Sequence, residues 1–137
     1  MKLLLYSDFK CMPIVDVKRF LPDDGKKKVC LFCTYADDEA EGYNNRAKAH
    51  LEEIFDEIIV LTPDFDFKAP IDCVFINGGY NYELSYKLKK YNQFDKIKEL
   101  ARKGVLYIGN SAGSVMVGND FSYTLEYDPP RIEMNFE

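Results

Sequence analysis

The sequence predicts an α/β fold with a mostly parallel sheet flanked by helices, and two observations carry this prediction. Five short apolar runs recur without alternating polar residues, which is typical of parallel strands that are buried on both faces. Amphipathic stretches lie between most of these runs, and such strand–helix alternation favours a layered fold with right-handed crossovers. The runs span residues 3–6, 29–34, 58–61, 73–76 and 105–108.

Three stretches between these runs have the apolar spacing of helices. They span residues 42–55, 81–90 and 92–103, and Asn92 with Asp95 resembles a capping pair for the third. The residues predicted to face the sheet are Ala47, Leu51, Ile54 and Phe55 in the first, Leu84 and Leu88 in the second, and Phe94, Ile97, Leu100 and Ala101 in the third.

The last part of the chain changes to strict alternation. Apolar and polar residues alternate over 121–128 and again over 131–137, on either side of Pro129-Pro130. This pattern predicts a one-sided C-terminal antiparallel β ribbon. Because an uncovered apolar face with an open edge pairs readily with another chain, we expect a homodimer.

Length and composition exclude several classes of protein. The 137 residues suit a single domain, and 47% hydrophobic with 30% charged residues exclude a disordered chain. A net charge of −5 lacks the basic field of a nucleic-acid binder. No apolar run approaches the roughly 18 residues of a membrane helix, and the run at the start is too short for a signal peptide. We therefore expect a cytoplasmic protein without nucleic-acid or membrane partners.

Cys30 and Cys33 form a C-x-x-C pattern inside the second predicted strand. Residues three apart on a strand point to opposite faces, so buried, reduced, structural thiols are the favoured interpretation. A redox pair would need a helix start here, and a zinc site would need two further ligands. Because no phosphate-binding loop or dinucleotide fingerprint occurs, we expect neither a cofactor nor a metal.

The most informative stretch is GNSAG at residues 109–113, which fits the pattern G-x-S-x-G. It directly follows the fifth apolar run and precedes a short helical run over 112–117. Such a turn, flanked by glycines, holds a serine at the top of a sheet with its hydroxyl exposed. The free N–H groups at a helix start also favour developing negative charge. Ser111 is therefore the candidate nucleophile, and a structural glycine turn is the alternative.

A second glycine turn, NGGYN at residues 77–81, follows the fourth apolar run. Glycines at the carboxyl end of a parallel strand let backbone N–H groups approach a ligand, and ligands bind at this edge of open α/β sheets. The N–H groups of Gly79 and Ala112 would together form an oxyanion hole for Ser111. The alternative is an ordinary β–α turn.

These two motifs resemble those of the S51 serine peptidases, a family that includes the α-aspartyl dipeptidases (peptidase E) and cyanophycinase. The family's motifs run G-x-S-A-G-A and G-G-G-N-T, and the order and spacing of the strands extend the resemblance over most of the chain. The resemblance implies a fold like the class I glutamine-amidotransferase domain, which is a flavodoxin-like three-layer arrangement, with serine in place of cysteine.

The resemblance also implies an activity, the cleavage of short, acidic peptides through an acyl-enzyme, and a set of site residues. In that set Ser111 is the nucleophile, Gly79 and Ala112 donate to the oxyanion, and Gly78, Asn81 and Asn110 line the substrate site.

Two motif positions depart mildly from the family, since Tyr80 replaces the third glycine and Ser114 replaces an alanine. The third departure is serious. The family's general base is a histidine after the serine, and no histidine follows Ser111 here. The single histidine, His50, lies on the first predicted helix beside its apolar face, which predicts a packed, partly buried side chain. We therefore expect residues 1–137 to form one domain that lacks the C-terminal part of the family fold.

Two functions remain open from the sequence. The chain is either a serine hydrolase of the S51 type or a catalytically silent module that keeps the fold and binds a peptide or partner. The second is motivated by the missing base, because a serine hydroxyl alone is a poor nucleophile at neutral pH. Reaction of Ser111 with a fluorophosphonate distinguishes the two.

Overall fold

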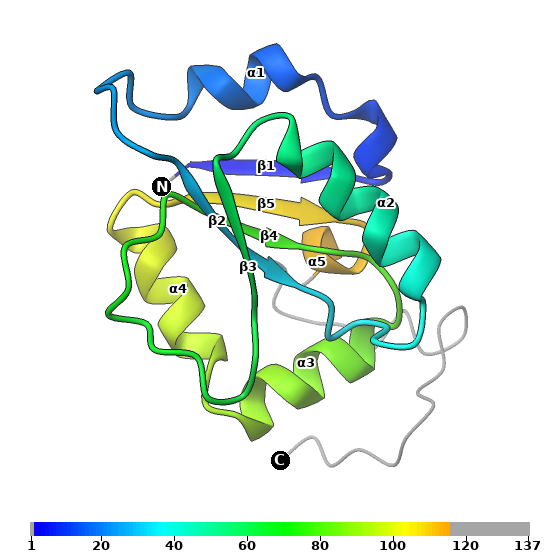
Figure 1. The fold of residues 1–137 in the computed structure, drawn as a ribbon. Helices are drawn as coiled ribbons and strands as arrows, with labels where there is room; N and C mark the ends of the chain where they lie inside the picture. Colours follow the sequence, from blue (N-terminus) through cyan, green and yellow to red (C-terminus); the bar gives the residue numbers. More distant parts are fainter. Residues whose placement is uncertain (1, 116–137) are drawn as a thin grey trace.

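A five-stranded parallel sheet between two layers of helices organises the computed structural model, which describes residues 2–115 (Figure 1). The strand order is β1-β5-β4-β2-β3, and all four strand pairs are parallel. This confirms the predicted mostly parallel sheet flanked by helices. The ribbon predicted within 121–137 lies outside the described residues. The strands are β1 (Leu3–Tyr6), β2 (Val29–Cys33), β3 (Glu57–Val60), β4 (Cys73–Ile76) and β5 (Leu106–Asn110).

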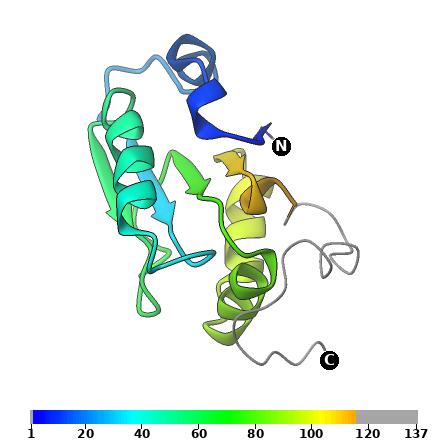
Figure 2. The same cartoon turned by 90° about the vertical axis from the view of Figure 1, so that its right-hand side faces the viewer.

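The helices divide between the two faces of the sheet. Helices α1 and α2 cover one face, and α3, α4 and α5 cover the other (Figures 1 and 2). The three helices predicted between the strands are present, whereas η1 and α1 were not predicted. No helix within residues 2–115 is long and apolar enough to cross a membrane. The helices are η1 (Phe9–Cys11, a 3-10 helix), α1 (Ile14–Arg19), α2 (Glu41–Glu52), α3 (Asn81–Lys90), α4 (Phe94–Arg102) and α5 (Ala112–Val115).

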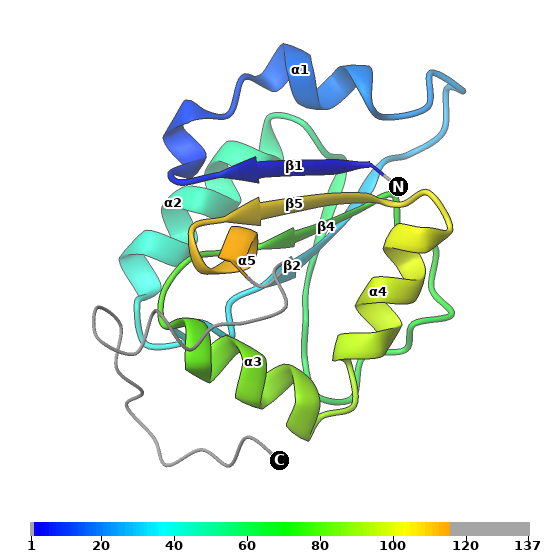
Figure 3. The same ribbon diagram turned by 180° about the vertical axis from the view of Figure 1, so that it is seen from behind.

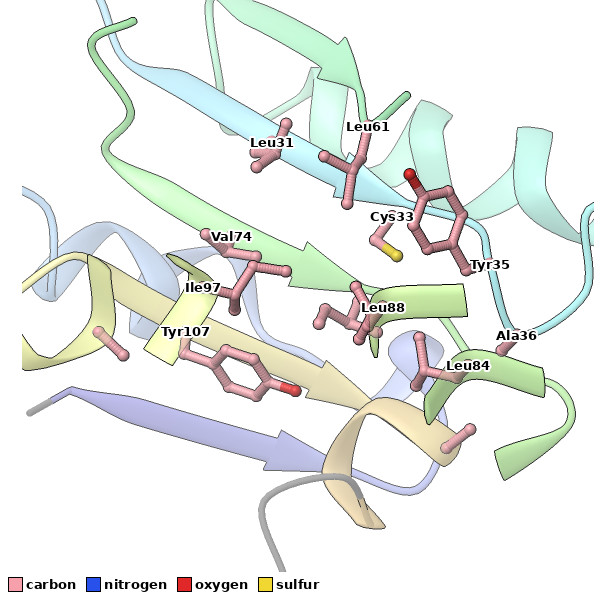
Figure 4. Packing of buried hydrophobic residues seen from close by; sticks show 13 residues of the cluster. Leu31, Cys33, Tyr35, Ala36, Leu61, Val74, Leu84, Leu88, Ile97 and Tyr107 are labelled. Carbon is pink, nitrogen blue, oxygen red and sulfur yellow. The ribbon is translucent and has the colours of Figure 1, made fainter. Parts of the chain in front are cut away.

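The core consists of two apolar clusters, one on each side of the sheet. Successive strand residues point to opposite faces, so Cys30 belongs to the cluster under α1 and α2, and Cys33 to the cluster under α3 and α4 (Figure 4). Both thiols are fully buried and neither forms a disulfide. The interpretation of this C-x-x-C as buried structural thiols is therefore confirmed.

The prediction that all five runs are buried on both faces is wrong for the two edge strands. In the described part of the chain, β1 and β3 each pair with one neighbour. Leu5 is 47% exposed and Val60 is 41% exposed, whereas every residue of β2, β4 and β5 is buried. Apolar composition alone does not distinguish a central strand from an edge strand.

The predicted capping pair of Asn92 and Asp95 is also wrong. Asn92 has a left-handed backbone (φ 55) and ends the turn after α3, where its N–H donates to the carbonyl of Lys89. Gln93 is the residue that precedes α4, and its side chain does not cap the helix. Its side-chain amide forms two other hydrogen bonds. Gln93 Oε1 accepts from the Tyr35 hydroxyl at 2.8 Å, and Nε2 donates to the Thr62 carbonyl at 2.8 Å.

Candidate active site

Ser111 lies between the end of β5 and the start of α5, at the carboxyl edge of the sheet (Figure 3). It is exposed, and its φ of 53 is in the left-handed region that non-glycine residues rarely adopt. Such strain persists only where the surroundings hold it, and it is typical of a sharp strand-to-helix turn that presents a nucleophile.

Hydrogen bonds from the edge strand hold this turn in place. The Ser111 N–H donates to the Tyr6 carbonyl at 2.7 Å. The Ser114 hydroxyl lies 2.8 Å from the same carbonyl and 2.7 Å from the carbonyl of Gly109, so its proton is shared between them. The last residue of β1 is therefore part of the support for the serine.

The two glycines of the G-x-S-x-G motif are required by close backbone contacts. A Cβ on Gly109 would lie 2.6 Å from the carbonyl of Gly113, and a Cβ on Gly113 would overlap the carbonyl oxygen of Ile76. The Tyr107 hydroxyl fixes the same region, since it donates to the Gly113 carbonyl at 2.6 Å. Helix α5 can therefore pack this tightly onto the sheet only without side chains at these positions.

The second glycine turn meets the first at Gly78. A Cβ on Gly78 would lie 2.9 Å from the Ser111 Cβ, 2.9 Å from the Tyr43 hydroxyl oxygen and 3.3 Å from the Asn110 carbonyl oxygen. Gly79 is exposed, with a φ of +147, and its missing side chain points at the backbone of Ala36 after β2. The structure thus brings the two predicted glycine motifs together.

The N–H groups predicted to form an oxyanion hole have no acceptor within residues 2–115. Neither Gly79 nor Ala112 donates a backbone hydrogen bond there, whereas the next amide, that of Tyr80, donates to the Ala36 carbonyl at 2.9 Å. Unpaired amides beside an exposed serine are available to a ligand. Their catalytic role stays a prediction.

A ladder of hydrogen-bonded, buried asparagine side chains lies beneath the site. Asn110 donates from Nδ2 to the Tyr43 hydroxyl (2.8 Å) and to Asn77 Oδ1 (2.9 Å), and Asn77 donates to Asn44 Oδ1 at 2.8 Å. Asn44 in turn donates to the Asp37 carbonyl. Asn110 is fully buried, so the structure places it beneath Ser111 rather than on the surface.

The remaining predicted residues are also placed. Asn81 is half-buried at the first position of α3, directly after the second glycine turn, and its role in substrate binding stays a prediction. His50 packs on α2, as predicted: its ring contacts Phe9, and Nε2 lies 3.2 Å from the Met12 carbonyl oxygen. No contact joins His50 to Ser111.

Sequence reasoning missed Tyr43 and the carbonyl of Tyr6. Tyr43 lies in the first turn of α2, and Tyr6 contributes only its backbone. Neither belongs to a motif, and each pairs with a residue far along the chain: Tyr43 with Asn110, and the Tyr6 carbonyl with Ser111. No spacing in the sequence points to them.

Comparisons with known proteins identify the family and a related structure. Residues 14–136 match the family model described as peptidase family S51. Among solved structures, a crystal structure of a protein described as a provisional peptidase E from Listeria monocytogenes EGD-e is similar, with a TM-score of 0.76 and 26% sequence identity. The match covers 93% of this chain and 67% of that chain. No curated protein matches the chain.

Proposed function

Because the chain belongs to peptidase family S51, we propose that it is a serine hydrolase that forms an acyl-enzyme at Ser111. The family supports a serine peptidase at a general level. The observation that carries the assignment to this residue is the backbone of Ser111, an exposed serine with a φ of 53 between β5 and α5.

The proposed reaction is acyl transfer. The Ser111 Oγ attacks the peptide carbonyl carbon and transfers its proton to water or to added imidazole, and the carbonyl oxygen becomes an oxyanion. The N–H groups of Gly79 and Ala112 donate to that oxyanion, each lowering the barrier by about 3–4 kcal/mol. Collapse of the tetrahedral intermediate expels the amine, which takes up that proton, and water then hydrolyses the ester, which releases the acid and restores the Ser111 hydroxyl.

The proton acceptor for Ser111 is not His50. His50 is the single histidine of the 137 residues. Its ring packs against Phe9, and its Nε2 lies 3.2 Å from the Met12 carbonyl oxygen. We therefore propose that the reaction of residues 1–137 is limited by the missing base, and that added imidazole accelerates it. Loss of a base slows acyl transfer by orders of magnitude, while stabilisation of the oxyanion survives.

We further propose a preference for acidic peptides, with Arg46 as the residue that attracts the carboxylate. Arg46 lies one turn after Tyr43 on α2, and its charge acts on the Tyr43 hydroxyl, which lies beside Gly78. Arg46 forms no ion pair with any residue between 2 and 115. An exposed guanidinium without an ion-pair partner in residues 2–115, one helical turn from Tyr43, suits a carboxylate ligand.

Labelling with a fluorophosphonate, with and without imidazole, tests the hydrolase. We expect covalent modification of the wild-type chain and of Ser7→Ala, which alters another exposed serine. Ser111→Ala should lose the label while remaining folded by circular dichroism. Absence of labelling from the wild-type chain, even with imidazole, would contradict the proposal.

Paired substrates test the preference for acidic peptides. We expect Arg46→Gln to lower kcat/KM for an aspartyl p-nitroanilide roughly tenfold or more, and to leave that for the alanyl compound unchanged. Arg102→Gln, at an exposed arginine on α4, is the control. Equal effects on kcat/KM for both substrates would show that Arg46 does not determine the preference for acidic peptides.

A catalytically silent module is the second candidate, and the position of His50 favours it. In that case short acidic peptides would raise the melting temperature of the chain with no turnover. Turnover that depends on Ser111 would count against it.

A further inference from the structure

The hydroxyl of Tyr43 lies beside the candidate nucleophile. A Cβ on Gly78 would be 2.9 Å from the Tyr43 Oη and 2.9 Å from the Ser111 Cβ, so these two atoms are separated by at most twice that distance. Only a glycine fits at position 78, because a Cβ there would crowd both the tyrosine hydroxyl and the serine. Tyr43 is half-buried, and its ring is tilted against that of Phe9, with the centroids 5.7 Å apart.

This hydroxyl has an unused proton. It accepts a hydrogen bond from Asn110 Nδ2 at 2.8 Å, and it donates to no residue between 2 and 115. A phenol has one proton to donate as well as lone pairs to accept. Since an amide already occupies a lone pair, the proton is available to an acceptor that enters the site.

Two other tyrosines show the contrasting arrangement. The Tyr35 hydroxyl donates to Gln93 Oε1 and the Tyr107 hydroxyl donates to the Gly113 carbonyl. Both protons are used within the protein, as is usual for buried tyrosines. Tyr43 differs because its hydroxyl donates to no residue between 2 and 115.

The charge state of Tyr43 agrees with a donor. Burial raises the pKa of the phenol, and so does the carboxylate of Asp8, while the hydrogen bond from Asn110 and the guanidinium of Arg46 lower it; the net shift is upward. The hydroxyl therefore keeps its proton at and well above neutral pH.

We propose that Tyr43 is a substrate-contacting residue whose hydroxyl donates a hydrogen bond to the acyl oxygen bound at Ser111, alongside the amides of Gly79 and Ala112. This inference rests on the proposed hydrolase. The hydrogen bond from Asn110 orients the phenol and leaves its proton free. A donor of this kind strengthens as negative charge develops, so it acts on the transition state more than on the bound substrate.

Replacement of the hydroxyl is the first test. We expect Tyr43→Phe to lower the second-order rate constant of fluorophosphonate labelling on the order of 100-fold. With a chromogenic ester, kcat should fall while KM stays unchanged. Tyr35→Phe, which removes a buried hydrogen bond of the same length away from the serine, should label at the wild-type rate.

Tyr43→Phe removes the donated proton and also the acceptor for Asn110, and loss of the Asn110 contact alone would disturb the serine. A ring-fluorinated tyrosine at position 43 separates the donor role from the acceptor role. Its phenol ionises near neutral pH, which removes the donated proton and strengthens the acceptor. We expect its labelling rate to fall as pH rises through that ionisation, against a wild-type control over the same range. A rate that stays level or increases would overturn the donor role.

The outcomes separate the inference from the function on which it rests. No labelling of the wild-type chain would overturn the hydrolase, and the inference with it. Labelling of the wild-type chain and of Tyr43→Phe at rates within threefold, with Ser111→Ala unlabelled, would overturn the inference alone.

Discussion

The backbone of Ser111 stores strain that its neighbours hold in place. A non-glycine residue in a sparsely populated backbone region costs about 1–3 kcal/mol. The carbonyl of Tyr6 offsets part of this cost by accepting the Ser111 N–H at 2.7 Å. The exposed hydroxyl is thus positioned by backbone contacts from strands and turns rather than by its own side chain.

Gly78→Ala should damage the site. The new Cβ would lie 2.9 Å from both the Ser111 Cβ and the Tyr43 Oη, and such overpacking costs typically about 1–3 kcal/mol. We expect a lower midpoint in urea denaturation and loss of fluorophosphonate labelling. Gly42→Ala is the control, because its Cβ would meet only the Arg46 guanidinium, at 3.4 Å. Full labelling of Gly78→Ala would show that the gap beside Ser111 is not needed.

Cys33 makes the free energy of unfolding depend on pH in the alkaline range. Burial raises the pKa of this thiol from an ordinary value of 9.0 to about 12. The neutral thiol is therefore favoured in the folded state, and its contribution is fully present below pH 9 and declines as pH rises toward 12. We expect the unfolding free energy of the wild-type chain to fall by up to about 1.4 kcal/mol per pH unit more steeply than that of Cys33→Val. Parallel pH profiles of the two chains, from urea titrations, would contradict this.

Single residues were predictable where local spacing defines them. The motif around Ser111 identified the turn and its glycines, because the contacts that require them form within a few residues and against the adjacent strand. Tyr43 and Asn44 escaped notice, because their hydrogen-bond partners, Asn110 at the end of β5 and Asn77 directly after β4, lie more than thirty residues away.

The amides of Asn44, Asn77 and Asn110 tie α2 to two central strands. All three side chains are buried, and each hydrogen bond between them is 2.8–2.9 Å long. Because buried polar groups are expensive when unpaired, the ladder stabilises the site only as a complete set.

Asn77→Leu should break this ladder. It removes partners from Asn44 Oδ1 and Asn110 Nδ2, and each orphaned group costs about 1–3 kcal/mol. We expect a lower melting temperature together with slower labelling of Ser111. Asn45→Leu, at an exposed neighbouring position of α2, should change stability by no more than about 0.5 kcal/mol. Similar stabilities of the two variants would argue against the ladder.

Strands and amphipathic helices were predictable to within a few residues, because their apolar patterns repeat. The short helices η1 and α1 were missed: α1 buries a single residue, Val17, so it carries little periodicity. The cap of α4 was misassigned because Gln93 is held by Tyr35 and Thr62, contacts that local sequence does not record.

The homodimer expected from the alternating segment 121–137 is a prediction for the assembled protein. We expect a mass of twice 15.9 kDa by light scattering at micromolar concentration. Met134→Asp, on the apolar set of positions, should shift the mass toward that of a monomer, whereas Asn135→Asp, on the polar set, should not. A wild-type mass equal to that of a monomer would contradict the prediction.

The strand order has a consequence for biosynthesis. Strand β1 pairs only with β5 in the described chain, and Leu3 lies opposite Tyr107. During translation, β1 therefore has no strand partner until β5 has been synthesised, about one hundred residues later. Such long-range closure slows folding and exposes an apolar edge meanwhile. The serine turn, whose Ser111 N–H donates to the carbonyl at the end of β1, therefore forms only once β1 and β5 have paired.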